Sequence, residues 1–95
     1  MTPEQEIERA GRAHEILDNE VFKDAVSQIE EALLSGIKRA PLKDADLRER
    51  ICAQIVALET ILNALRTTID TGKLAQKQLE IEQSRLSHLK AAVGF

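Results

Sequence analysis

Apolar residues recur at every seventh position through the C-terminal half of this 95-residue chain. One series comprises Ile51, Leu58, Leu65, Leu79, Leu86 and Val93, and Gly72 is its only gap. A second series, at the companion position of the heptad, comprises Leu47, Ile61, Ala75 and Leu89, while Ile55, Leu62 and Ile69 widen the stripe in its first half. A seven-residue period sustained over this distance is typical of a helix that packs lengthwise against other helices.

Gly72 decides whether this pattern belongs to one helix or two. The preceding stretch, Thr67–Thr71, is poor in helix formers, and Gly costs about 1 kcal/mol relative to Ala in a helix. A break here would produce a hairpin of two helices. The heptad phase is the same on both sides of Gly72, however, and a turn has no reason to preserve it. We therefore predict one continuous helix from about Ala45 to about Ala92, roughly 70 Å long, with a kink or break near Gly72 as the alternative.

A first short helix is predicted at the N-terminus. Thr2 is a favourable N-cap, Pro3 suits the first helical position, and Gln5 completes a capping box. Asp18 and Asn19 mark the end of this helix, because both are favourable caps for a new one. A single kinked helix that continues through Asp18 and Asn19 is the alternative.

A second short helix is predicted from about Glu20 to about Lys38, and Pro41 stops it. Asp46, with Glu49 three residues later, is a favourable start for the long helix, and Asp44 is the competing N-cap. The sequence therefore predicts an all-α fold in a single helical domain, residues 1–95. The N-terminal helical pair occupies residues 1–40, and the long heptad-patterned helix occupies residues 44–93.

The core of this fold has to be aliphatic. Aromatic residues make up 2% of the chain, with no Trp and no Tyr, so Leu, Ile, Val and Ala have to provide the packing. Those residues suit helices packed side by side, whereas strands are enriched in aromatic and β-branched residues. The composition thus agrees with the helical pattern.

The long helix is too extended for the rest of the chain to cover. The two short helices contain about 37 residues together and span roughly 55 Å even end to end. The apolar stripe from Ala75 to Val93 is therefore expected to be exposed in a monomer, and apolar patches of that extent are uncommon on monomers. We predict a homo-oligomeric, coiled-coil-like helical bundle, with an interface formed by Ile51, Leu58, Leu65, Leu79, Leu86, Leu89 and Val93.

Charge gives limited support to nucleic-acid binding. The net charge is −3: residues 1–72 hold nine Lys/Arg and fourteen Asp/Glu, or −5, and residues 73–95 hold four and two, or +2. The densest basic stretch comprises Lys38, Arg39, Lys43, Arg48 and Arg50, but Asp44, Asp46 and Glu49 reduce its sum to +2 over residues 38–50. Nucleic-acid sites usually add stacking rings or a denser basic face. These five basic residues are the candidate DNA contacts of a second hypothesis.

The sequence contains no catalytic or metal-binding motif. His14 lies four residues before Asp18, but no further ligands cluster with them, and His88 is expected to be solvated. Cys52 has no Cys/His signature around it and is expected to be a small buried hydrophobe. The glycine spacing of a phosphate loop is missing around Gly72. We predict no catalytic residue, no metal, no cofactor and no small-molecule substrate, and therefore a protein that is not an enzyme.

The same features predict a cytoplasmic protein. One cysteine excludes an intrachain disulfide framework and suits a reducing compartment. The first residues are acidic and polar, unlike a secretory signal. No apolar run approaches the ~20 residues that span a bilayer, so no membrane partner is expected.

Three short stretches carry a resemblance to a known group of proteins. They are the run from Ala13 to Ala25, the run from Asp44 to Arg50, and Gly72-Lys73-Leu74-Ala75. Together they resemble small all-α proteins encoded by tailed bacteriophages and prophages, over roughly residues 10–80. The resemblance implies a virion-assembly or DNA-packaging context, in the bacterial cytoplasm or the virion, with other phage structural proteins as further partners. It carries over no catalytic residue.

Two functions follow as hypotheses. The first is a homo-oligomeric structural or assembly component, phage- or prophage-encoded, that acts through helix–helix packing with copies of itself. The second is an oligomeric DNA-binding protein of the packaging-recognition type, similar to a small terminase subunit. Salt-dependent DNA binding separates them, because phosphate contacts weaken steeply with added salt.

Overall fold

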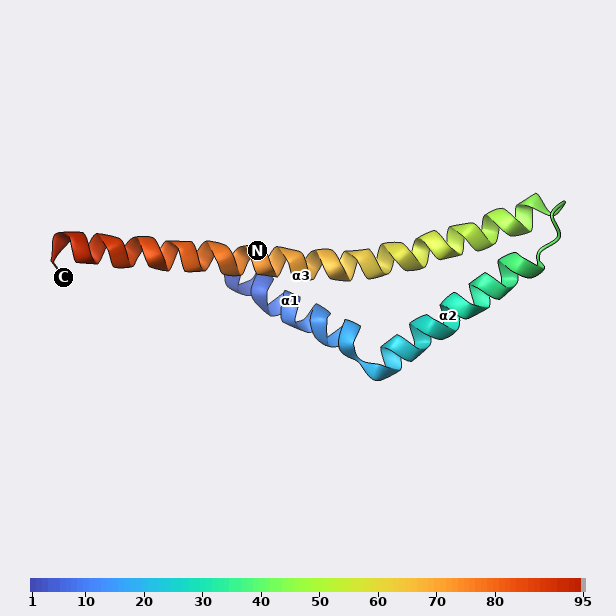
Figure 1. The fold of residues 1–95 in the computed structure, drawn as a ribbon, viewed down its shortest axis with the longest axis horizontal. Coiled ribbons are helices and arrows are strands. Elements are labelled where there is room, and N and C mark those ends of the chain that lie inside the picture. Colours follow the sequence, from blue (N-terminus) through green and yellow to red (C-terminus); the bar gives the residue numbers. More distant parts are fainter. Residues whose placement is uncertain (95) are drawn as a thin grey trace. The chain divides into compact units, whose positions relative to one another are not determined.

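The computed structural model describes residues 1–94 and contains three α-helices (Figure 1). They are α1 (Pro3–Asp18), α2 (Glu20–Arg39) and α3 (Ala45–Val93). No β-strand occurs in this part of the chain. The prediction of an all-α fold, with two short helices followed by one long helix, is confirmed.

The capping box predicted for α1 is present. The backbone N–H of Gln5 donates to Thr2 Oγ1 at 3.2 Å, and the N–H of Thr2 donates to Gln5 Oε1 at 2.9 Å. These reciprocal bonds satisfy two donors that a helix N-terminus would otherwise leave unpaired. Helix α1 therefore begins where the sequence predicted.

Helices α1 and α2 are separate, as predicted. Asn19 has extended backbone angles between them, and its Oδ1 accepts a 2.9 Å hydrogen bond from the N–H of Phe22. At the other end of α2, the N–H of Ala40 donates to Gly36 O at 2.9 Å, and Pro41 follows. Proline has no N–H to continue the helix, so α2 ends there.

The start of α3 was predicted at the wrong aspartate. Asp44, not Asp46, is the N-cap, because Asp44 Oδ1 accepts a 3.1 Å hydrogen bond from the N–H of Leu47. The first helical residue is Ala45, so Asp46 lies inside the first turn. There its negative carboxylate is still stabilised by the positive end of the helix dipole. Either aspartate could cap a helix, and in the structure the cap bond is the one that joins Asp44 to the N–H three residues later, at Leu47.

Helix α3 is continuous through Gly72 for 49 residues, as the heptad phase predicted. It ends at Val93, and Gly94 follows with a positive φ of 79°. A left-handed glycine after the last helical residue is a common helix terminator, because glycine adopts that conformation without a Cβ penalty.

The tertiary contacts divide the chain into two units. Unit 1 comprises Met1–His14 together with the chain from Arg66 onward, and unit 2 comprises Glu15–Leu65. Unit 1 thus contains most of α1 and the C-terminal part of α3. Unit 2 contains α2, the turn after it and the beginning of α3.

Small residues form the contact between α1 and α3 in unit 1. Ala75 is only 1% exposed and Ala13 is also buried. A Cβ added to Gly72 would overlap the Cβ of Ala10 and would lie 3.0 Å from the carbonyl oxygen of Glu6. The backbones approach so closely at this point that only glycine fits, which explains a glycine in the middle of a long helix. The expectation that Ala75 is exposed was wrong, because α1 covers it.

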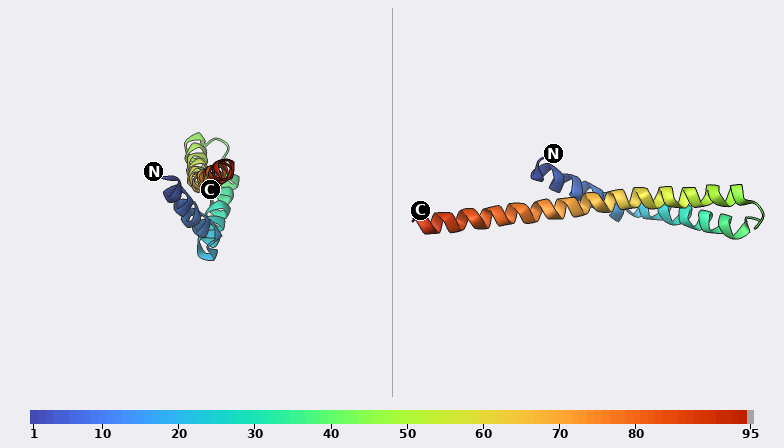
Figure 2. Two further views of the ribbon diagram at one scale, coloured as in Figure 1. Left: turned by 90° about the vertical axis from the view of Figure 1, so that its left-hand side faces the viewer. Right: turned by 90° about the horizontal axis from the view of Figure 1, so that it is seen from above.

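In unit 2, α2 and the beginning of α3 run in opposite directions on either side of the turn that joins them (Figure 2), and Figure 1 shows that they diverge with distance from this turn. Ile51, Leu62 and Ala40 are buried there. A Cβ on Gly36 would lie 3.4 Å from Ile51 Cδ1, so the two helices are in contact at this pair. The core of unit 2 is aliphatic, in agreement with the composition.

The covered face of α3 follows a heptad whose companion series differs from the predicted one. It comprises Ile51, Ile55, Leu58, Leu62, Leu65, Ile69, Gly72, Ala75 and Leu79, all buried or half-buried. The steps alternate between four and three residues as far as Gly72, and a second step of three then leads to Ala75. Ile61, a member of the predicted companion series, is exposed, whereas Ala75, which occupies the same heptad position after this shift, is buried.

Candidate interaction surface

The apolar face of α3 continues beyond the part that the chain covers. Leu79 is half-buried, and every residue from Glu80 to Gly94 is exposed. Leu86, Leu89 and Val93 are each about 60% exposed. We call these three residues, with Leu79 at their beginning, the C-terminal ridge.

The ridge is narrow and is bordered by two cations. At 100° per residue, its four members fall within a sector of about 80° around the helix axis. Arg85 lies on one side of that sector and Lys90 on the other, and residues 83–94 contain no Asp or Glu. Glu82 lies within the sector, next to Leu79. The surface is therefore an aliphatic stripe with positive borders along most of its length.

The predicted oligomer seam divides into two parts. Ile51 is buried against α2 of its own chain, next to Gly36, and Leu58 and Leu65 are half-buried in unit 2. These three residues already have intrachain cover, and Ile51 belongs to the core of unit 2. The C-terminal part of the seam stays exposed.

The five candidate DNA contacts fall into two groups: four are exposed, and one is bonded to backbone carbonyls. Lys38, Arg39, Lys43 and Arg50 are exposed around the turn between α2 and α3. The guanidinium of Arg48 instead donates to the carbonyl oxygens of Ile37 and Ala40, both at 3.3 Å. Arg48 therefore satisfies carbonyls at the C-terminal end of α2, where a cation also favours the helix dipole.

An apolar groove between α2 and α3 was not singled out from the sequence. It encloses about 250 Å³, and its lining residues are Glu30, Leu33, Leu34, Ile55, Leu58 and Glu59. Leu33, Ile55 and Leu58 are half-buried, and Leu34 is 52% exposed. The adjacent leucines at 33 and 34 are the signal that could have revealed it, because two successive positions on a helix cannot both face one neighbour.

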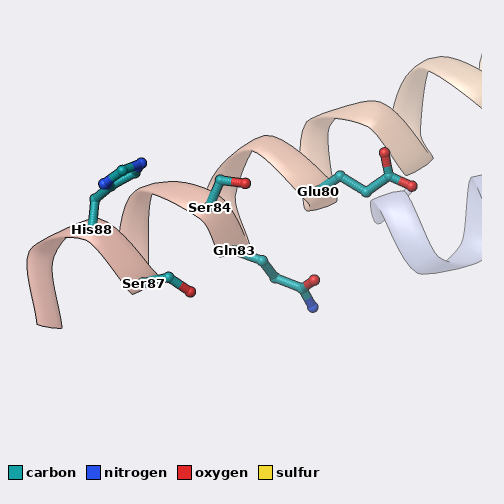
Figure 3. A pocket seen from close by; sticks show the side chains of 5 residues that line it. All are labelled: Glu80, Gln83, Ser84, Ser87 and His88. Atoms are coloured by element: carbon teal, nitrogen blue, oxygen red, sulfur yellow. The ribbon is translucent and has the colours of Figure 1, made fainter. Parts of the chain in front are cut away.

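A polar hollow on the exposed part of α3 has no catalytic geometry. Its lining residues are Glu80, Gln83, Ser84, Ser87 and His88 (Figure 3). All five come from one helix, and their side chains point outward along it without converging on a common point. General acid–base or nucleophilic catalysis needs groups within hydrogen-bond reach of one reacting atom.

The remaining reactive side chains lie on the surface. Cys52 is exposed, so its expected burial was wrong: it lies one position after Ile51, outside the covered stripe. His88 is exposed, as expected, and His14 is exposed as well. No group of three His, Cys, Asp or Glu residues within residues 1–94 is arranged to hold a metal ion. None of the helices in that range has the length and apolarity to cross a bilayer.

Comparison of the chain with protein-family models, with curated proteins and with solved structures gave no match.

Proposed function

We propose that this chain is a homo-oligomeric structural or assembly component that acts through helix–helix packing, with the C-terminal ridge as a contact surface. The observation that carries the proposal is the run from Glu80 to Gly94, in which residues 1–94 provide no cover for a heptad-spaced aliphatic face. A face of this pattern on a helix is typical of packing against a further helix.

The energy available from the ridge indicates a reversible, concentration-dependent association. Burying a whole Leu or Val side chain contributes about 1.5–3 kcal/mol, so a side chain that is about 60% exposed has roughly 1–2 kcal/mol left to gain. Three such residues, matched by an equal apolar area on the partner, give about 6–12 kcal/mol. Association costs about 4–15 kcal/mol in lost freedom. The ridge therefore needs a second complementary feature, such as charge, to hold a stable complex.

The proposal includes a phage or prophage context. Its support is the resemblance of the stretches that begin at Ala13, Asp44 and Gly72 to small all-α proteins of tailed bacteriophages and prophages. That resemblance implies a virion-assembly or DNA-packaging context. In this role the chain would bind copies of itself and other structural proteins of the particle, and would perform no chemical step.

The DNA-binding alternative has weaker support. Four of its five cations are exposed, but Arg48 is occupied at the end of α2, and Asp44, Asp46 and Glu49 alternate with the others. A phosphate-binding face gains affinity from each cation that releases a counterion, and neighbouring carboxylates oppose that gain. We therefore favour the structural role.

The substitution Leu86→Asp tests the proposal. A carboxylate at the centre of the ridge has to be desolvated for the contact to form, so we expect the assembly to dissociate to monomers while the helix content stays close to wild type. Light scattering coupled to size exclusion measures the mass, and circular dichroism at 222 nm measures the helix.

Ile81→Asp is the matched control. Ile81 is 58% exposed and Leu86 is 57% exposed, both on α3, but Ile81 lies about 140° away around the helix. It should leave the mass unchanged. A Leu86→Asp variant that keeps the wild-type mass, or a wild type that is monomeric at high concentration, contradicts the proposal.

A further inference from the structure

We propose that the assembly is head-to-tail: the C-terminal ridge of one copy lies in the groove between α2 and α3 of the next copy. This inference rests on the proposed function and adds the identity of the surface that receives the ridge. Both surfaces belong to the same chain, and each includes exposed apolar side chains, Leu34 at the groove and Leu86 in the ridge.

The shapes of the two surfaces are complementary. The ridge is a single row of Leu and Val on one face of a helix, and the groove is a trough between two helices with a leucine-rich floor. A helix laid along a trough between two others completes a local three-helix packing, in which apolar side chains of the third helix fill the space of about 250 Å³.

The charges at the borders are complementary as well. Glu30 stands on the α2 wall of the groove and Glu59 on the α3 wall, and both are exposed. Arg85 and Lys90 stand on opposite sides of the ridge. A positively bordered stripe in a negatively bordered trough brings unlike charges together on both sides, which selects this pairing over others.

The same charges disfavour two ridges packed in parallel. That arrangement would place Arg85 and Lys90 beside their own copies, and like charges at an interface oppose association. The net charges support only the C-terminal part of this contact. Residues 15–65 hold six Lys/Arg and ten Asp/Glu, or −4, and residues 83–94 carry +2, but Glu80 and Glu82 bring the sum over residues 79–94 to zero. The unit that contains the groove therefore attracts the ridge from Arg85 onward.

Leu58 in the groove and Leu86 in the ridge belong to the same uninterrupted helix, α3. We place the contact between copies, where it joins two different surfaces, so each added copy leaves one groove and one ridge free. Contacts of this kind produce closed rings or open filaments.

Mixing two variants tests the inference. Leu34→Asp damages the groove and keeps the ridge, whereas Leu86→Asp damages the ridge and keeps the groove. We expect each variant alone to be monomeric, and an equimolar mixture to form a heterodimer of twice the monomer mass, because one intact groove meets one intact ridge. Ile61→Asp is the control for the groove, since Ile61 is 57% exposed on α3 and lies about 160° from Glu59 around the helix. It should assemble like wild type.

The outcomes separate the inference from the proposed function. If Leu34→Asp alone keeps the wild-type mass, the ridge binds another surface, and the head-to-tail inference is wrong although the chain still oligomerises through the ridge. If both variants are monomeric and their mixture stays monomeric, the inference is also wrong. If Leu86→Asp alone keeps the wild-type mass, the proposed function fails, and the inference fails with it.

A second experiment, in which charges are exchanged between the two surfaces, tests the inference even if Leu34→Asp loses its helix content. Reversing the two walls with Glu30→Lys and Glu59→Lys should weaken assembly by about tenfold, as expected from two rim ion pairs. Adding Arg85→Glu and Lys90→Glu to the same chain should restore it. Sedimentation over a concentration series measures both effects, and four substitutions that assemble no better than two overturn the inference.

Discussion

The close approach of α1 to α3 at Gly72 makes one substitution informative. Gly72→Ala improves helix propensity by about 1 kcal/mol, and at an open position it would stabilise the protein. Here the new Cβ overlaps the Cβ of Ala10 and lies 3.0 Å from Glu6 O. Neither of these atoms can rotate away, because one is fixed to the backbone and the other belongs to it. Relief requires α1 to move as a whole.

The magnitude follows from these two opposing terms. Overpacking a tight site costs about 1–3 kcal/mol, and displacement of α1 also exposes part of Ala75, which is 1% exposed in the native contact. After the helix-propensity gain is subtracted, we expect a net loss of about 1–2 kcal/mol in the free energy of unfolding. For a chain of this size that loss lowers Tm by about 4–16 °C.

Gly11→Ala is the matched control. Gly11 is also within a helix, but a Cβ there has no neighbour within 4 Å. We expect Gly11→Ala to raise stability by up to about 1 kcal/mol. Thermal and urea unfolding, followed at 222 nm at one fixed protein concentration, give both values. The double variant Ala10→Gly/Gly72→Ala should recover part of the loss, because it removes the overlapping Cβ. A Gly72→Ala variant as stable as Gly11→Ala would refute the close packing of α1 on α3.

Three further predictions concern the helix ends and the basic turn. Asn19→Ala should lower the free energy of unfolding by about 0.5–2 kcal/mol in a urea titration, because α2 loses its N-cap. Asn19→Asp should retain most of the wild-type stability, because Asp is also a favourable N-cap. Arg48→Met should cost about 1–3 kcal/mol, since it leaves carbonyls at the end of α2 without their donor, whereas Arg50→Met should be neutral. In fluorescence anisotropy with duplex DNA at low salt, we expect no salt-dependent binding, and binding that disappears on reversing Arg39 and Lys43 would favour the DNA-binding alternative.

The elements of the fold could be predicted because their signals are local. The cap residues Thr2 and Asn19 each bond to a backbone N–H three residues away, so the sequence alone contains both partners. The continuity of α3 was equally accessible, because a heptad phase that is unchanged across Gly72 is a property of one helix. Asp44 and Asp46 were harder to separate, since both residue types and both positions suit a helix start.

Which residues of each helix are buried by a neighbouring helix could not be predicted in the same way. A heptad defines a sector of a helix, but it does not specify which part of that sector a neighbour occupies. Ala75 was expected to be exposed because the extent of α1 against α3 depends on contacts distant in sequence. Cys52 was expected to be buried because the sequence does not show that α2 covers the position of Ile51 and leaves the next one exposed. The groove beside Leu34 has the same origin: it exists only once α2 and α3 lie next to each other.

The uncovered end of α3 has a consequence for the order of events in assembly. A separate peptide of fourteen residues would be only marginally helical in water, because the first turn is costly to nucleate. In this chain the run from Glu80 to Val93 avoids that cost because it continues a 49-residue helix in which Ile51, Leu62 and Ala75 are buried. The aligned row of leucines therefore depends on the folding of the helix that precedes it. A newly made or unfolded copy displays no such row, so recruitment into a larger particle would select for copies that have already folded.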